Sequence, residues 1–244
     1  MSNFNAKDVK DRLVQWIRDF FEFNGKDCNA VIGISGGLDS SVVAALCVEA
    51  LGKDRVIGVL MPDGKQTDKD MSIMLIRFLN IESYECNIRY SRLAILDEMK
   101  CNGINISEQT KINLAPRIRM STLYAVSQSM NGRVANTSNL SESYVGWDTR
   151  YGDSVGDFSP LFNLTKTEIR EIAKELNLPD KLVNKTPADG LCGKTDEEAF
   201  GFSYDVLDRY IRTGEIDDLD IKNKIDAMHN KNLFKLSPMP SFTL

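Results

Sequence analysis

Apolar residues along this chain alternate between two spacings, one typical of helices and one typical of buried strands. Apolar positions from Val9 to Phe20 recur every three or four residues, which predicts an amphipathic helix over residues 5–23. Short apolar runs rich in β-branched residues follow, and these are typical of buried parallel strands. We expect strands at residues 30–34, 55–62, 83–88 and 133–138, and further helices at residues 38–51, 68–79, 92–99, 108–130 and 165–176.

Two of these helices carry local boundary signals. Thr165 is followed by Glu168 three residues later, and this pair predicts a capping box at the start of the last helix. Pro116 lies within residues 108–130. Because proline lacks the backbone N–H and crowds the preceding turn, we expect it to start or disturb that helix.

Strands that alternate with helices at this pace indicate an α/β fold, a Rossmann-like doubly wound parallel sheet with helices on both faces. Ligands of such sheets bind beyond the carboxyl ends of the strands, so the loops after Ile34, Met61 and Thr137 are the first candidates for a site. No internal repeat, low-complexity tract or Gly/Ser-rich linker divides the 244 residues. We therefore expect a single domain, residues 1–244.

Composition and charge exclude several classes of function. A hydrophobic share of 42% and a charged share of 27% suffice for a full core. The net charge of −5 gives no support to a nucleic-acid partner, and the short apolar runs predict no membrane span. The N-terminal residues form no apolar signal core, so we expect a cytoplasmic protein. Five cysteines without a CxxC pair, and only one histidine, His229, predict free thiols and no structural zinc site.

The strongest local signal is the run SGGLDSS at residues 35–41, directly after one expected strand and before a helix. Glycines let the backbone approach a ligand closely, and the N–H groups of a helix start form an anion site. Asp39 would repel an anion there unless a cation lay between them, which predicts Mg²⁺ bridging Asp39 and a polyphosphate. The alternative is an ordinary turn in which Ser35 and Asp39 cap the helix. Neither GxxxxGK[ST] nor GxGxxG occurs, so γ-phosphate transfer and a dinucleotide redox fold are disfavoured.

Residues 33–40, GISGGLDS, resemble the signature of the N-type ATP pyrophosphatases, which cleave ATP between the α and β phosphates. Three later stretches are similar to NAD synthetases within that group: NLAPRIRM at residues 113–120, NTSNLSE at residues 136–142 continuing to Asp157, and PADGLCGKTDEE at residues 187–198. The resemblance covers nearly the whole chain in the right order. It implies a fold like that of the adenine-nucleotide alpha-hydrolases.

The resemblance also implies roles for individual residues. It places ATP against Gly33, Ile34, Ser35, Gly36, Gly37, Leu38, Asp39, Ser40, Thr137, Lys166 and Ala188. It places deamido-NAD against Asn113, Arg117, Arg150, Asp157, Phe234 and Lys235. Asp39 and Glu142 would hold Mg²⁺. In the implied reaction ATP adenylates the nicotinate carboxylate with release of pyrophosphate, and ammonia then yields NAD and AMP. Asp153 is our candidate to accept a proton from ammonium, so Asp39, Glu142 and Asp153 form the catalytic set.

Some of these residues also have simpler interpretations. Asn113 and Arg117 share one helical face and suit an anionic ligand, but such a face can also be merely solvated. Glu142 could be a surface acid. Lys166 stands in the first turn of a helix, where the dipole disfavours a cation, which indicates either a phosphate partner or a solvent-facing lysine. Residues 147–158 are interpreted as a mobile active-site loop.

The chain departs from the resembling family in a few places. Pro116 and Ala188 replace residues usual there, which puts a phosphate contact at Ala188 in doubt. Phe234 and Leu236 flank Lys235 where His-Lys-Arg is common, so the contact of this segment with deamido-NAD is in doubt, and Asn139 stands where some members have histidine.

The nitrogen source, the partners and two rival functions complete the expectations. The phosphate loop begins at residue 35, which leaves room for one helix before it, so we expect direct use of ammonia and no glutaminase domain. The resemblance implies a homodimer.

One rival function is that of a tRNA sulfur-transfer enzyme, which would be expected to carry a thiolate pair and a basic surface. The other is a nucleotide sensor without turnover, which has less use for two metal carboxylates.

Overall fold

The computed structural model describes residues 4–64, 69–187 and 195–242. Its centre is a parallel sheet with the strand order β3-β2-β1-β4. The strands are β1 (Asn29–Gly33), β2 (Val56–Leu60), β3 (Glu82–Glu85) and β4 (Gly132–Ala135). Val31 on β1 pairs with Ile57 on one side and Val134 on the other. The predicted α/β class with a parallel sheet is confirmed.

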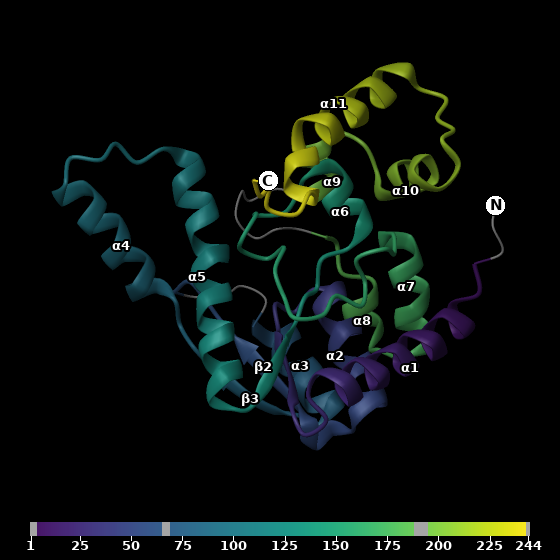
Figure 1. Ribbon diagram of the computed structural model, residues 1–244. Coiled ribbons are helices and arrows are strands. Elements are labelled where there is room, and N and C mark those ends of the chain that lie inside the picture. Colours follow the sequence, from purple (N-terminus) through teal and green to yellow (C-terminus); the bar gives the residue numbers. More distant parts are fainter. Residues whose placement is uncertain (1–3, 65–68, 188–194, 243–244) are drawn as a thin grey trace.

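Helices cover both faces of this sheet, as predicted (Figure 1). One face packs against α1 (Ala6–Asn24), α2 (Leu38–Leu51) and α7 (Lys166–Glu175), together with α3 (Lys69–Leu79) and the short α8 (Asp180–Val183). The other face packs against α5 (Glu108–Ser129), on which α4 (Arg89–Cys101) lies. Ile32 points into the first core and Val31 into the second, because successive side chains of a strand face opposite ways.

The remaining helices form a small core of their own. They are α6 (Leu140–Val145), α9 (Asp196–Phe200), α10 (Tyr204–Thr213) and α11 (Leu219–Leu236), and Figure 1 shows them grouped together. Phe200, Leu207 and Ile225 are fully buried at their centre. No element was predicted after residue 176, so this cluster is not among the expectations. A 3-10 turn, η1 (Lys53–Arg55), connects α2 to β2.

Several element boundaries test the expectations directly. The helix at residues 38–51 and the capping box of Thr165 and Glu168 are confirmed. Pro116 does not start a helix: α5 begins eight residues earlier and continues through it. The third strand was predicted at the right place but ends three residues earlier than expected, because β3 spans Glu82–Glu85 at the exposed sheet edge, where no buried face imposes alternation on the sequence.

Two further expectations concern the whole chain. No helix within the described residues is both long and apolar enough to span a membrane. Cys28, Cys47, Cys86 and Cys101 are free thiols, which confirms that prediction for four of the five cysteines, and Cys192 lies outside the described residues.

Candidate active site

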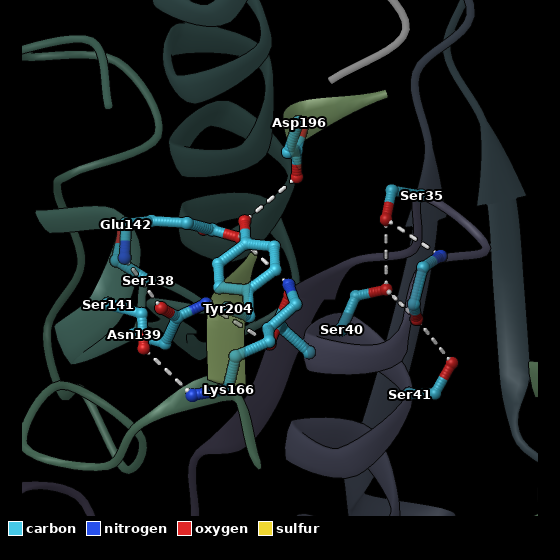
Figure 2. Close-up of polar contacts among 12 residues, drawn as sticks. Ser35, Ser40, Ser41, Ser138, Asn139, Ser141, Glu142, Lys166, Asp196 and Tyr204 are labelled. Carbon is cyan, nitrogen blue, oxygen red and sulfur yellow. Dashed lines mark hydrogen bonds and ion pairs between the residues drawn. The ribbon is translucent and has the colours of Figure 1, made fainter. Parts of the chain in front are cut away.

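The predicted phosphate loop connects the end of β1 to the start of α2. Gly36 adopts a φ of +80°, a conformation open to glycine without a Cβ clash. Gly37 occupies the N-cap position of α2 and has no side chain to cover the N–H groups of the first helical turn, which lack partners within the helix. Ser35 Oγ accepts a hydrogen bond from Gly37 N at 3.1 Å (Figure 2). The turn thus keeps the features of an anion site.

Asp39 does not cap the helix that it opens. Its carboxylate turns across the site toward two other elements: Lys166 Nζ lies 2.6 Å from Asp39 Oδ2, and Asn139 Nδ2 donates to Asp39 Oδ1 at 3.3 Å. The same Nζ lies 2.8 Å from Glu142 Oε1. A helix-capping role for Asp39 and a surface position for Glu142 are therefore both wrong. Two carboxylates from α2 and α6 meet at one cation from α7.

Lys166 is buried, with 3% of its surface exposed, so the solvent-facing alternative is also wrong. Burial alone works against its charge, but Asp39 and Glu142 outweigh that effect and raise the pKa of Lys166. Its backbone N–H donates to Ser141 Oγ at 2.9 Å (Figure 2), and Asp208 Oδ2 accepts from Thr167 N at 2.8 Å. These two bonds satisfy donors in the first turn of α7 and fix where the lysine side chain begins.

A second layer of polar groups supports Glu142. Tyr204 is almost fully buried, and its hydroxyl lies 2.9 Å from Asp196 Oδ2 and 3.3 Å from Glu142 Oε1. Trp147 Nε1 donates to the other Asp196 oxygen at 3.2 Å. Burial raises the pKa of both Asp196 and Tyr204. This network links α9 and α10 to the carboxylate pair (Figure 2).

Asn136 holds the loop that follows β4. Its Nδ2 donates to the carbonyls of Asp153 at 2.7 Å and Val155 at 3.2 Å, and its Oδ1 accepts from Ser138 N at 2.9 Å and Ser159 Oγ at 2.8 Å. All four hydrogen-bonding positions of the amide are thus used. Residues 147–158 contain no helix or strand, as expected of a loop, and Asn136 holds its backbone at Asp153 and Val155. The mobility of this loop stays a prediction.

Asp153, the candidate proton acceptor, lies on this loop. The residue as a whole is exposed, whereas its carboxylate turns toward the protein and accepts a hydrogen bond from Thr149 N at 2.9 Å. The carboxylate is the group that titrates, and its burial raises the pKa of Asp153 to about 6. A carboxylate with such a pKa can exchange protons near neutral pH.

Four of the residues expected to bind deamido-NAD come together beside this loop. Asn113 Oδ1 accepts from Thr149 Oγ1 at 3.3 Å, and Arg117 Nε donates to the carbonyl of Arg150 at 3.3 Å. The Arg150 guanidinium carbon lies 5.4 Å from the centre of the Phe234 ring. Side chains from α5, α11 and the loop thus share one region.

The remaining residues expected to bind ATP or deamido-NAD do not all lie in this region with free side chains. Lys235 Nζ donates to the carbonyls of Gly146 and Asp148 at 2.7 and 2.9 Å. Asp157 accepts from the backbone N–H of Val134 in β4 and from Tyr124 Oη, so both its oxygens already have partners. Thr137 is partly exposed just after β4. Ala188 lies outside the described residues.

Comparison with known proteins decides the family. The model of the NAD synthase family matches residues 9–240. The chain belongs to the NAD synthase family. The predicted family resemblance is therefore confirmed, as is the prediction of a ligase of NAD biosynthesis.

Named relatives of the family cover most of the chain. It is 40% identical to the NH(3)-dependent NAD(+) synthetase of Methanococcus aeolicus over 216 residues, which are 85% of this chain and 82% of that protein. The enzyme of the same name from Finegoldia magna is 38% identical, with 85% of each chain covered.

Solved structures of the family agree with the fold. An NMN synthetase from Francisella tularensis superposes with a TM-score of 0.88 at 32% identity, covering 98% of this chain and 100% of that one. The NH3-dependent NAD synthetase from Campylobacter jejuni superposes with a TM-score of 0.79 at 30% identity, with the same coverage.

Asn136, Tyr204 and Asp196 contact the residues of the candidate site but were not predicted to belong to it. Asn136 and Asp196 lie inside the stretches that carry the family resemblance, so a signal was present without a role attached to it. Tyr204 lies outside them, and nothing in its spacing indicates a contact with Glu142, 62 positions earlier. Lys185, whose Nζ donates to the carbonyl of Gly36 at 3.1 Å, was missed as well.

Proposed function

We propose that the protein joins ammonia to the nicotinate carboxylate of deamido-NAD, with cleavage of ATP to AMP and pyrophosphate. The observation that carries this proposal is the meeting of Asp39 and Glu142 at one buried cation, directly beside a glycine-rich loop at a helix start. A cation bound by two carboxylates next to an anion site is the arrangement that a metal–nucleotide complex requires.

The carboxylates fit Mg²⁺ in chemistry and number. Both offer oxygen, the ligand type that Mg²⁺ prefers, and this ion usually takes only one or two protein carboxylates beside phosphate oxygens and water. Asp39 and Glu142 would hold the ion, and bound Mg²⁺ would neutralise charge on the phosphates.

The reaction then proceeds in two displacements. An oxygen of the nicotinate carboxylate attacks the α-phosphorus of ATP, and the bond to the bridging oxygen of pyrophosphate breaks. The nitrogen of ammonia next attacks the acyl carbon, AMP leaves with the bridging oxygen, and the nitrogen loses a proton. The loop at residues 35–40 and Lys166 hold the phosphates in place, so positioning and charge stabilisation supply the rate without a side-chain nucleophile.

Asp153 is the group that we assign to the proton. With a pKa of about 6, its carboxyl group is mostly ionised at neutral pH and can accept a proton. Its hydrogen bond from Thr149 N and the anchoring of its backbone by Asn136 keep it in one place. The region of Asn113, Arg117, Arg150 and Phe234 would bind the remainder of deamido-NAD.

A second candidate substrate is the shorter nicotinate mononucleotide, whose amidation gives NMN. Two observations favour it. The NMN synthetase from Francisella tularensis superposes with a TM-score of 0.88, against 0.79 for the Campylobacter jejuni NAD synthetase. Phe234 and Leu236 also replace the histidine and arginine common beside Lys235 in the family, so groups suited to the phosphates of a dinucleotide are missing here.

One assay separates the two substrates. Purified protein is incubated with ATP, Mg²⁺ and ammonium, with either deamido-NAD or nicotinate mononucleotide, and AMP, NAD and NMN are quantified. The main proposal predicts AMP and NAD in equal amounts, together with a higher kcat/KM for deamido-NAD. A higher kcat/KM for the mononucleotide would transfer the proposal to NMN synthesis. AMP formation without either amide would contradict both.

The nitrogen source and the assembly are proposed together with the function. We expect glutamine to replace ammonium poorly in the same assay. A homodimer, to be checked by sedimentation, and a cytoplasmic location both stay predictions.

A further inference from the structure

We propose that Lys166 is an internal counter-ion, which holds the metal position of the nucleotide-free enzyme and leaves it when Mg²⁺ and ATP bind. This inference rests on the proposed role of Asp39 and Glu142 as metal ligands. It adds that one residue changes its partner, from carboxylates to phosphate, during loading of the site.

The geometry places the ammonium where the metal would lie. Lys166 Nζ is 2.6 Å from Asp39 Oδ2 and 2.8 Å from Glu142 Oε1. A Mg²⁺ ion bound to both oxygens would lie about 2.0–2.1 Å from each, and so within the same gap between the two carboxylates. Since an ammonium and a divalent ion cannot share that gap, one must displace the other.

The site needs a cation in the absence of nucleotide. The side chains of Asp39 and Glu142 are only 17% and 20% exposed, and Tyr204 connects Glu142 to a further carboxylate, Asp196. Like charges so placed disfavour one another unless a positive charge lies between them. Salt in solution cannot supply that charge effectively, because buried pairs are screened little. Lys166 supplies it from within the protein.

The anchoring of Lys166 permits the exchange. Its backbone N–H is held by Ser141 Oγ in the first turn of α7, whereas the charge stands at the end of a flexible four-carbon stem. Asp39 lies in the first turn of α2, within residues 35–40 that hold the phosphates, so an ammonium bonded to Asp39 already lies close to the phosphate position. We therefore infer a short movement from the carboxylates to a phosphate oxygen, after which every charge again has a partner.

This exchange makes metal and nucleotide binding depend on each other. A metal ion alone must displace Lys166 without offering it a new partner, so it binds weakly. A metal ion with ATP offers Lys166 a phosphate, so both bind well. Removing the charge of Lys166 should consequently strengthen metal binding in the absence of nucleotide, whereas a lysine that only contacts ATP would have no such effect.

The test measures Mn²⁺ binding by EPR of the free ion, with Mn²⁺ as the probe for the magnesium position. Without nucleotide, Lys166→Met should bind Mn²⁺ at least about tenfold more tightly than the unaltered protein, a change within the usual range of coupling between sites. Lys166→Arg keeps the charge and should bind it as weakly as the unaltered protein. Lys174→Met is the matched control, because Lys174 lies on the same helix but pairs with Glu171 at the surface.

The outcomes separate this inference from the proposed function. If the unaltered protein with a non-hydrolysable ATP analogue binds no Mn²⁺ beyond that held by the analogue alone, the proposed metal site is wrong. If it binds Mn²⁺ with the analogue, but Lys166→Met without nucleotide matches the unaltered protein, only the counter-ion role is overturned.

A thermal shift measurement covers a variant that folds poorly. Mn²⁺ should raise the Tm of Lys166→Met more than that of the unaltered protein, since it replaces the missing charge. If Lys166→Met is unfolded without metal, added Mn²⁺ should restore its far-UV circular dichroism. The inference is overturned if Mn²⁺ raises the Tm of a folded Lys166→Met no more than that of the unaltered protein. It is also overturned if the variant is unfolded and Mn²⁺ does not restore its fold.

Discussion

The role of Asn136 can be tested by a single substitution to aspartate. The two side chains have the same shape, but the amide NH2 donor of asparagine becomes an acceptor oxygen in aspartate. Asn136→Asp replaces the Nδ2 donor, which bonds the carbonyls of Asp153 and Val155, by a second acceptor. The oxygen that accepts from Ser138 N and Ser159 Oγ is unchanged. The variant therefore tests the donor end of one buried amide with almost no change in volume.

The expected loss of stability follows from those contacts. Each lost hydrogen bond is worth about 1 kcal/mol, and a buried polar group left facing unsuitable partners costs roughly 1–3 kcal/mol more. The carbonyl of Asp153 keeps its bond from Ser138 Oγ at 3.0 Å, which favours the lower part of that range. We expect a loss of about 3 kcal/mol, which lowers the Tm of a chain of this size by roughly 6–12 °C.

Urea unfolding at pH 7 and pH 5 is the assay. The introduced carboxyl would be buried beside carbonyl oxygens, so its pKa should be raised in the folded state. Its protonated form can donate a hydrogen bond, and the loss of stability should therefore be smaller at pH 5 than at pH 7. Asn223→Asp is the control, because Asn223 is exposed on α11, and a surface change of this kind stays within about 0.5 kcal/mol. A stability of Asn136→Asp equal to that of the control would refute the anchoring role of Asn136.

Three further predictions address the site and the core. Tyr204→Phe removes the hydroxyl beside Glu142, so it should lower the free energy of unfolding by about 1.5–3 kcal/mol and weaken Mn²⁺ binding in the presence of ATP. Unchanged metal binding would mean that the hydroxyl does not position Glu142. The kcat of the unaltered protein at saturating ammonium should rise with pH through about 6, because Asp153 has a pKa of about 6 and must lose its proton to act as a base. Asp153→Asn should be slow and lack this rise; if the rise persists in the variant, another group causes it. Gly132→Ala should destabilise the fold by about 1–3 kcal/mol, since the added Cβ would lie 2.4 Å from Val31 Cγ2; a Tm equal to that of the unaltered protein would show that the sheet yields there.

Local signals in the sequence predicted much of the α/β core. The helix over residues 38–51 was placed correctly at both ends because a glycine precedes it and another follows it. The capping box at Thr165 was correct because its geometry depends on four consecutive residues. The end of strand β3 was predicted three residues too late, because an exposed edge strand has no apolar face to reveal its period.

The partners of side chains could not be predicted in the same way. Lys166 meets Asp39 across 127 positions of sequence, and only the packing of α7 beside α2 brings them together. Its burial was therefore invisible to local reasoning, which left a solvent-facing lysine open. The cluster of α6, α9, α10 and α11 was missed for another reason. Its helical spacing, from Tyr204 through Leu207 to Ile211, is present in the sequence, but these helices pack on one another rather than on the sheet.

In the proposed function, the loop before α2 binds the triphosphate of ATP while Asp39 and Glu142 hold its metal ion. A crystal structure with a non-hydrolysable ATP analogue and Mn²⁺ tests it most directly, since anomalous scattering locates the ion. We predict a peak about 2 Å from both carboxylates, the phosphates on the N–H groups of residues 36–40, and Lys166 Nζ moved to a phosphate oxygen. A triphosphate bound elsewhere, or an ion that contacts neither carboxylate, would contradict the account.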